Sequence, residues 1–373
     1  MYFKNGFDPE SEKREDGFRF EPDMLPLVDE APAVNTPVAD NTKRVKNIFS
    51  RAFLALFTYL AVSQIAMSVI EIVSAIVLNP DAYNDVSQNY TLAVIKSSIC
   101  QYIFGFGAFM LFIFKLPTFK PMSPAIRMKP AGVLSMFTVC FAISYVGSMI
   151  GQLLSNAVGA VTGQVPDNTV NLIISSIPMW LLILVVVVIG PIFEELVFRK
   201  FLMDRLLCVG EYGAVLVSSL AFGLFHQNLY QLFYAAMIGV VLGFVYVKTR
   251  NILYPIIIHV CFNFFGSALP MLLDDYIYGY YDMLEILQSG GQVDQALMAK
   301  YESVVMIYGT LIGAICIFGF AILIKKLRSG EFRLSRECEL YVPKNRLIDT
   351  CTVNGGVIAF VIFTLIFTVL SLF

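Results

Sequence analysis

Long apolar segments alternate with short polar ones along most of the chain after residue 45. A helix needs about 20 mostly apolar residues to cross ~30 Å of hydrocarbon. The pattern therefore predicts an all-α fold class, a polytopic transmembrane helix bundle of about nine spans. Eight is the alternative count, because the fifth and sixth segments are short and the second contains Lys96. The segments are residues 52–78, 91–114, 131–155, 172–193 (continuing as helix to about 207), 212–227, 231–248, 252–273, 304–324 and 354–372.

The loops between these segments alternate between basic and base-free. The stretches NPDAYNDVSQNY, TGQVPDNTVN and QNLYQ contain no Lys or Arg, and the loop at 274–303 carries only Lys300. Loops rich in Lys and Arg stay in the cytoplasm. The alternation predicts a cytoplasmic N-terminus and a C-terminus on the other side. The bases at the predicted cytoplasmic side include Lys43, Arg44, Lys46, Arg51, Lys115, Lys120, Arg127, Lys129, Lys200, Arg205, Lys248, Arg250 and those of KKLR at 325–328.

Composition agrees with an integral, multi-pass membrane protein, which in a bacterium lies in the plasma membrane. The 373 residues are 57% hydrophobic and 14% charged, whereas a soluble domain carries about 25% charged residues. Residues 1–45 are polar and lack the features of a signal peptide, so we expect a disordered cytoplasmic tail followed by a transmembrane domain at 46–373. The net charge is −2, and no basic patch suggests nucleic acid as a partner.

Few ionisable residues fall inside the predicted spans. Such residues are costly in hydrocarbon and are functional candidates by default. Both histidines of the chain are among them, in the apolar runs SSLAFGLFHQN and YPIIIHVCFNFFG. The seven cysteines are scattered without metal-ligand spacing, which is typical of small buried apolar residues. The in-span ionisable residues are Glu71, Lys96, Glu194, Glu195, Arg199, His226 and His259.

Helical spacing assigns partners within the segment GPIFEELVFRKFL. Glu195 and Arg199 are four residues apart with Glu first, the favourable order for an ion pair. Glu194 is turned about 100° from Glu195 around the helix, which leaves it free to face the two histidines.

His259 and Asn263 are also four residues apart, on one face of their helix. We therefore expect Glu194, His226, His259 and Asn263 to converge from three helices, in a site that opens toward the cytoplasm. Glu195 and Arg199 are expected to support this site. Taken alone, the Glu195–Arg199 pair is typical of a structural contact and Asn263 of interhelical packing, so the prediction depends on all of them together.

Two chemistries suit this set of side chains. A carboxylate at a low-dielectric site can act as a general base on water, with imidazoles orienting the water and an amide stabilising the oxyanion. Alternatively, Glu194, His226 and His259 could bind Zn²⁺, with water as the fourth ligand. The chain has neither an HExxH motif nor a serine in a GxSxG context. The residues alone leave both routes open.

Three short motifs resemble those of a known membrane protein family. EELVFR (Glu194 to Arg199) matches an EExxxR pattern, FGLFH (Phe222 to His226) an FxxxH pattern, and HVCFN (His259 to Asn263) an HxxxN pattern. In this order, on apolar helices, they resemble the CPBP family, which comprises the CAAX-type proteases and the bacteriocin-processing (Abi) proteins. The resemblance covers a motif core at about residues 180–270.

The resemblance implies an intramembrane endopeptidase that hydrolyses peptide bonds near the cytoplasmic membrane face. It implies Glu194 as the base that activates water, His226 and His259 as residues shaping the site, and Asn263 as part of the oxyanion hole. Descriptions of the family differ on whether a metal is bound. Water activated by Glu194 without a cofactor is the preferred route, and a metalloendopeptidase with Zn²⁺ is the alternative. The implied partner is a peptide or membrane-anchored protein in the lipid bilayer, and the implied roles are peptide maturation or bacteriocin self-immunity.

Two other classes of function compete with the protease hypothesis. A non-catalytic membrane scaffold or immunity protein could retain the fold, but the complete set of three motifs argues against lost catalysis. A proton-coupled transporter could use Glu and His as a relay. That class favours inverted repeats with broken helices in matching halves, and the sequence shows no such repeat.

Overall fold

The computed structural model describes residues 40–78, 80–166 and 169–372, and these are helical wherever they form regular structure. Residues 1–39 of the predicted tail lie outside the described residues, and the first helix begins at Thr42. The N-terminal part comprises α1 (Thr42–Val77), α2 (Pro80–Ser87), α3 (Tyr90–Ile99), the π-helical η1 (Cys100–Gly105), α4 (Phe106–Ile113), α5 (Pro130–Thr162) and α6 (Thr169–Ser176).

The middle of the chain holds the segments with the sequence motifs. It comprises α7 (Met179–Leu181), η2 (Leu182–Ile189), α8 (Gly190–Glu195), η3 (Leu196–Met203), α9 (Asp204–Leu206), η4 (Leu207–Val209), α10 (Glu211–Phe225), α11 (Leu229–Thr249), α12 (Leu253–Asn263), η5 (Phe264–Ala268) and α13 (Leu269–Leu272). The C-terminal part comprises α14 (Asp274–Gln288), α15 (Gln295–Ser329), α16 (Lys344–Thr352) and α17 (Gly355–Leu370).

Seven helices in the described part of the chain are long and apolar enough to cross a membrane. The helices α16 and α17, bent by 55° at a short break, add an eighth if they form one span. The predicted count of about nine is therefore too high, and the alternative of eight is the upper limit. The difference lies at the fifth predicted span, because α10 has only 15 residues and reaches about 22 Å, less than the hydrocarbon thickness.

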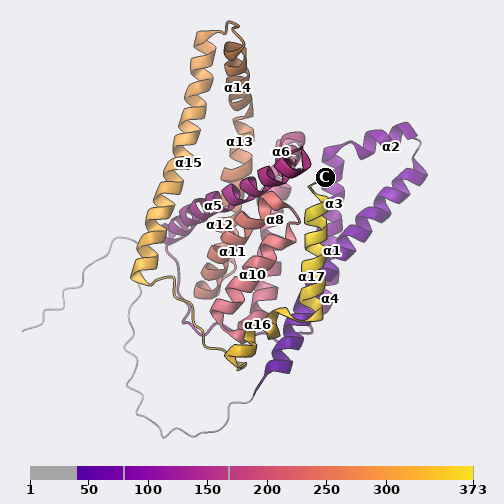
Figure 1. Ribbon diagram of the computed structural model, residues 1–373, viewed down its shortest axis with the longest axis vertical. Helices are drawn as coiled ribbons and strands as arrows, with labels where there is room; N and C mark the ends of the chain where they lie inside the picture. Colours follow the sequence, from indigo (N-terminus) through magenta and orange to yellow (C-terminus); the bar gives the residue numbers. More distant parts are fainter. Residues whose placement is uncertain (1–39, 79, 167–168, 373) are drawn as a thin grey trace, which may run out of the picture.

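The basic loops meet at one end of the bundle, the lower end in Figure 1. The backbone N–H of Ile126 donates to the Lys248 carbonyl at 2.8 Å. The buried Glu211 carboxylate accepts hydrogen bonds from the N–H groups of Ser123 (2.6 Å) and Ser335 (2.9 Å). We call this the basic end; it comprises residues 114–129, 204–212, 249–252 and 330–343. Bringing the basic loops together agrees with the alternation in the sequence, and the cytoplasmic position of this end stays a prediction.

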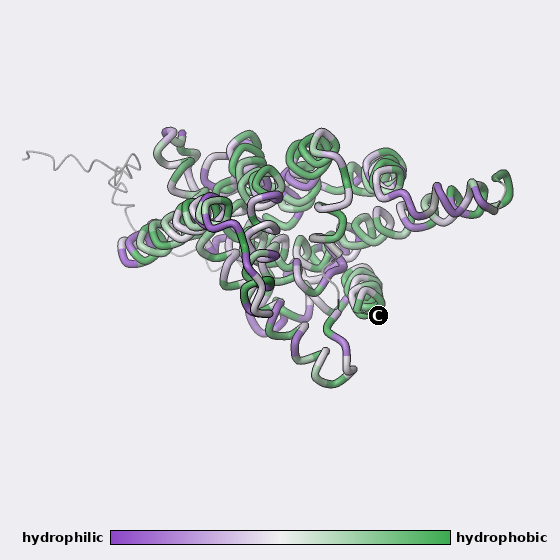
Figure 2. Tube along the Cα trace, turned by 90° about the horizontal axis from the view of Figure 1, so that it is seen from above, coloured by the Kyte–Doolittle hydropathy of each residue, from purple (hydrophilic) through white to green (hydrophobic). Residues whose placement is uncertain are grey.

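The base-free end lies opposite and comprises residues 80–89, 163–166, 226–228 and 289–294. Figure 1 shows α2, α6 and the tip of the α14–α15 pair at this upper end, together with the C-terminus. Hydrophobic residues cover the helices around the periphery as well as in the middle, as the view from above shows (Figure 2). Large exposed apolar side chains such as Ile76 of α1 and Ile307 of α15 suit contact with lipid rather than water.

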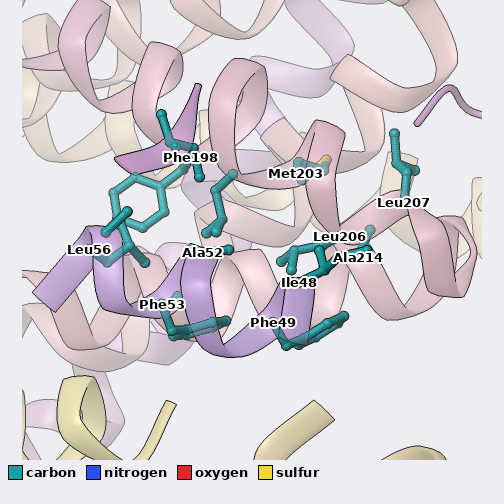
Figure 3. Packing of buried hydrophobic residues seen from close by; sticks show 14 of the residues in the cluster. Ile48, Phe49, Ala52, Phe53, Leu56, Phe198, Met203, Leu206, Leu207 and Ala214 are labelled. Atoms are coloured by element: carbon teal, nitrogen blue, oxygen red, sulfur yellow. The ribbon is translucent and has the colours of Figure 1, made fainter. Parts of the chain in front are cut away.

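The largest apolar core packs the first half of α1 against η3, α9 and α10. Ile48, Phe49 and Ala52 of α1 are buried against the helical segment that carries the EELVFR motif, whose Phe198 is also fully buried. Figure 3 shows Ile48 beside Leu206 and Ala214, and Leu56 of α1 beside Phe198. One side of the helical segment with the EELVFR motif thus belongs to the apolar core that it shares with α1. The glutamates lie on another side of this segment.

Small residues let α5 approach α11 closely. Gly147 and Gly151 of α5 have the small-xxx-small spacing that brings membrane helices into backbone contact. A Cβ at Gly147 would lie 2.5 Å from Tyr234 Cα, and one at Gly151 would lie 3.1 Å from the Tyr230 carbonyl oxygen. The close contact positions the N-terminal half of α11, where Tyr230 and Tyr234 lie.

Gly147→Ala is therefore expected to push α5 away from α11 and to lower the stability of the protein. Overpacking of this kind costs about 1–3 kcal/mol, which should appear as a lower midpoint of thermal unfolding in detergent. Gly107→Ala is the matched control, because its Cβ would meet nothing within 4 Å on α4. Equal midpoints for the two variants would contradict the proposed packing.

Candidate active site

One continuous helical segment, Met179–Val209, carries both glutamates and the arginine of the first motif. The α-helical turn α8 that contains Glu194 and Glu195 is flanked by the π-helical segments η2 and η3. Such π-helical turns often occur at functional sites, because they change which side chains share a face. Here the segment places Glu194 at a cavity and Glu195 in the protein interior.

Glu195 and Arg199 form the ion pair that their spacing predicts. The Nε atom of Arg199 lies 3.1 Å from Glu195 Oε2, and the side chains are 1% and 0% exposed. The guanidinium also donates to the Gly239 carbonyl of α11 at 3.4 Å and lies 4.6 Å from the ring centroid of Phe222. Arg199 thus connects the motif helix to Phe222 of α10 and Gly239 of α11. It also neutralises the buried Glu195 carboxylate.

His259 of α12 lies between the two glutamates. Its Nδ1 is 2.9 Å from Glu195 Oε1, and its Nε2 is 3.6 Å from Glu194 Oε2. A carboxylate can only accept a hydrogen bond, so the geometry assigns a proton to Nδ1 and directs Nε2 toward Glu194. Helical spacing paired Glu195 with Arg199 alone and missed the contact with His259, because spacing within one helix says nothing about contacts between helices.

His226 and Asn263 face the same cavity from the ends of α10 and α12. The His226 ring packs edge-on against Phe222, with the ring centroids 5.0 Å apart, and no hydrogen bond joins it to another described residue. The Asn263 amide donates one hydrogen to the Val186 carbonyl at 2.8 Å, which leaves its second N–H hydrogen for a ligand. Glu71 and Lys96, the other in-span ionisable residues, form an ion pair with each other away from this cavity.

The cavity has a volume of about 490 Å³ and is lined by Glu194, His226, His259 and Asn263 together. Its other polar lining residues come from helices that the motifs do not cover, and include Tyr102, Ser148, Gln152, Gln231 and Tyr234. Sequence reasoning missed these residues because it considered charged side chains, histidines and the residues of the three motifs. The signal that could have found them is the presence of neutral polar residues within the segments 91–114, 131–155 and 231–248.

The cavity lies in the half of the bundle nearer the base-free end. Its lining includes Ile174 of α6 and Tyr230 at the start of α11, and the Tyr230 hydroxyl donates to the Pro166 carbonyl at 2.7 Å. On α11 the lining stops at Ile238, well before the basic end. The sequence predicted an opening toward the basic loops, and the side on which the cavity opens stays a prediction.

The side chains expected as zinc ligands do not form a ligand set. Catalytic Zn²⁺ takes three protein ligands with nitrogen, sulfur or oxygen donors. Among the described residues, no group of three His, Cys, Asp or Glu side chains is arranged to hold a metal ion. Glu194, His226 and His259 line one cavity without that convergence.

The fold and the site together define a multi-pass helical membrane protein with a carboxylate–histidine cavity. Residues 176–265 match the family model of the Rce1-like type II CAAX prenyl endopeptidases. This segment holds all six motif residues, and it forms a domain of that family, within the wider CPBP group of membrane peptidases.

One relative adds to this assignment. The Bacillus subtilis (strain 168) protein named "Putative membrane peptidase YdiL" is 35% identical over 94 residues, which is 25% of this chain and 38% of the relative. The match thus spans about two fifths of the relative's length. No solved structure gives a significant match to the chain.

Proposed function

We propose that this protein is an intramembrane endopeptidase in which Glu194 activates the water that hydrolyses a peptide bond. The observation that carries the proposal is the position of His259. The Nδ1–H of His259 donates to Glu195. The Nε2 of His259 lies 3.6 Å from Glu194 Oε2 at the wall of the cavity. The family of residues 176–265 consists of peptidases, which favours this reading over a transporter.

The gap between Glu194 and His259 suits a water molecule. A neutral imidazole with its proton on Nδ1 has a lone pair on Nε2. Glu194 Oε2 and this lone pair are then two acceptors, which cannot hydrogen-bond to each other because neither carries a hydrogen. A water that donates one hydrogen to each would have its oxygen lone pairs directed away from both, toward the cavity.

Hydrolysis then follows from the groups already in place. As the water oxygen bonds to the scissile carbonyl carbon, Glu194 accepts a proton, and the carbonyl oxygen becomes an oxyanion. His226 and the second amide hydrogen of Asn263 face the cavity as donors to that oxyanion. The carbon–nitrogen bond then breaks, and the proton held by Glu194 passes to the departing amine.

Peptide cleavage by the purified full chain in detergent tests this proposal. Internally quenched, uncharged peptides are suitable substrates, with the products sequenced by mass spectrometry. We expect cleavage that 1,10-phenanthroline changes by less than about twofold, because Glu194 and His259 are sufficient to position the water.

Two results would contradict the proposal in different ways. Activity that the chelator removes and added Zn²⁺ restores, with metal bound stoichiometrically and lost on His226→Ala, would establish a metal route. Absence of any cleavage, with normal biological function of a Glu194→Ala strain, would instead favour a non-catalytic scaffold.

A further inference from the structure

The Tyr234 side chain of α11 carries a hydroxyl hydrogen that no described residue accepts. The side chain is half-buried and lines the cavity together with Glu194 and Asn263. The Gln231 side-chain amide, one turn earlier on α11, donates to the Tyr234 hydroxyl oxygen at 3.0 Å. A hydroxyl can accept such a bond and still donate its own hydrogen. Since this group lies at the cavity wall, its hydrogen is available to a ligand.

Close packing against two neighbouring helices fixes the position of Tyr234. On one side is α5, where a Cβ at Gly147 would lie 2.5 Å from Tyr234 Cα. On another side is α10, where a Cβ at Gly223 would lie 2.9 Å from Ala236 Cβ. A donor that is held in place before the reaction needs no reorganisation when charge develops beside it. This is the condition under which a hydrogen bond stabilises a transition state most effectively.

The two other tyrosines among the described lining residues are placed differently. Tyr230 donates its hydroxyl hydrogen to the Pro166 carbonyl at 2.7 Å. The Tyr102 hydroxyl lies close to the helix that carries the glutamates, since a Cβ at Gly190 would be 3.4 Å from it. Gly190 precedes Glu194 by one turn, so this hydroxyl is on the side of the proposed base. The tyrosine hydroxyl that is both oriented by a partner and free to donate is therefore the one on the second turn of α11.

The oxyanion of the proposed reaction has room for a third donor. An oxygen with a full negative charge carries three lone pairs. Asn263 offers the one amide hydrogen that Val186 does not use, and a neutral His226 has a single N–H. A hydroxyl that donates to an anionic oxygen forms a hydrogen bond about twice as strong as one between neutral groups. The Tyr234 hydroxyl is a donor of this kind.

We infer that Tyr234 is a further catalytic residue, whose hydroxyl donates a hydrogen bond to the oxyanion, and that Gln231 is the positioning residue that orients it. The bond is weaker to the neutral carbonyl of the bound peptide, so it favours the transition state over the substrate. The phenol keeps its proton throughout, and the proton transfers through Glu194 are unchanged. The inference rests on the proposed function, but binding tests it without requiring turnover.

Tyr234→Phe removes the hydroxyl and retains the ring. We expect kcat for peptide cleavage to fall by about 10²-fold, the lower end of the effect of removing one oxyanion donor. KM should change by less than about twofold, because the lost bond is strong only in the transition state. Tyr281→Phe on α14 is the matched control, since Tyr281 is 58% exposed and lies outside the cavity. Equal unfolding midpoints of both variants in detergent would show that the fold is retained.

Gln231→Leu tests the positioning role. It removes the donor to the phenolic oxygen and leaves the phenol, so kcat should fall by about five- to tenfold. In Gln231→Leu/Tyr234→Phe, kcat should be no lower than in Tyr234→Phe, because Gln231 acts only through the hydroxyl. A loss in the double variant equal to the product of the two single losses would exclude this positioning role.

Binding of a tetrahedral mimic measures the donor without turnover. The probe is a hexapeptide of Ala, Leu and Phe with an N-terminal fluorophore and a phosphinate group in place of the central peptide bond. The same peptide with a ketomethylene group presents a neutral carbonyl instead. Fluorescence polarisation with the full chain in neutral detergent gives both dissociation constants. We expect Tyr234→Phe to bind the phosphinate at least about tenfold more weakly than the wild type, with ketomethylene binding changed by less than about twofold.

The outcomes separate this inference from the proposed function. A Tyr234→Phe protein with unchanged phosphinate affinity, or with more than about half of the wild-type kcat, would overturn the inference and leave the proposed function standing. Phosphinate affinity that depends on Tyr234, in a protein that cleaves no peptide, would support the donor and refute the proposed function. Absence of both cleavage and phosphinate binding in the wild type would overturn both.

Discussion

Glu194→Gln is expected to lower kcat for peptide cleavage by about 10³-fold, because proton transfer by a positioned base contributes about 10²–10⁴-fold. The amide of glutamine has nearly the shape of the carboxylate but cannot accept the proton of the attacking water. Glu194 is only partly buried, at 24% side-chain exposure, and its contact with His259 is long. The substitution should therefore leave the fold and the thermal unfolding midpoint in detergent unchanged.

The matched control for Glu194→Gln is Glu302→Gln on the exposed surface of α15. It makes the same chemical change outside the cavity and should retain full kcat. The value of KM should change little in either variant, since the proton transfer occurs after binding. A Glu194→Gln protein that keeps more than about a tenth of the wild-type kcat would exclude Glu194 as the general base.

Arg199→Met is expected to destabilise the protein more strongly than Gly147→Ala or Glu194→Gln. It would leave the Glu195 carboxylate fully buried with only His259 as a partner. Breaking a buried ion pair from one side costs about 3–5 kcal/mol. We expect a sharply lower unfolding midpoint in detergent and a poor yield of folded protein.

A second variant separates the charge from the shape of this side chain. In Glu195→Gln/Arg199→Met, both charges are removed and the glutamine oxygen can still accept the His259 Nδ1–H, so much of the lost stability should return. Arg346→Met is the surface control, because Arg346 is 63% exposed and lies 3.9 Å from Asp40, where an ion pair contributes about 0–1 kcal/mol. A double variant no more stable than Arg199→Met would argue against the charge of Glu195 as the cause.

Hydropathy predicted most of the helices of this protein. It overestimated how many of the described helices can cross a membrane. The apolar run at 212–227 does become a helix, α10, but it ends at Phe225 and turns at His226. His226 lies at this turn and lines the cavity. A count based on segment length cannot distinguish a short helix buried by its neighbours from one that crosses the bilayer.

The contacts of the candidate site are of two kinds: those within one helix could be predicted from the sequence, and those between helices could not. The Glu195–Arg199 pair could be predicted because both residues lie on one helix, one turn apart. The bond from His259 to Glu195 could not be predicted, since it joins residues 64 positions apart. Tyr102 reaches the cavity because η1 packs on Phe193 of the motif helix, and Gln152 because α5 packs against α11 and α12. No local pattern records these contacts.

The placement of Glu195 and Arg199 on a single helix also matters during synthesis. An ionised residue at the centre of a helix costs about 2.5–3.5 kcal/mol at the translocon. These two can neutralise each other as soon as their own helix forms, whereas His259 emerges from the ribosome 64 residues later. The nascent segment can thus leave the insertion machinery for the lipid before the histidine that completes the cluster has been made.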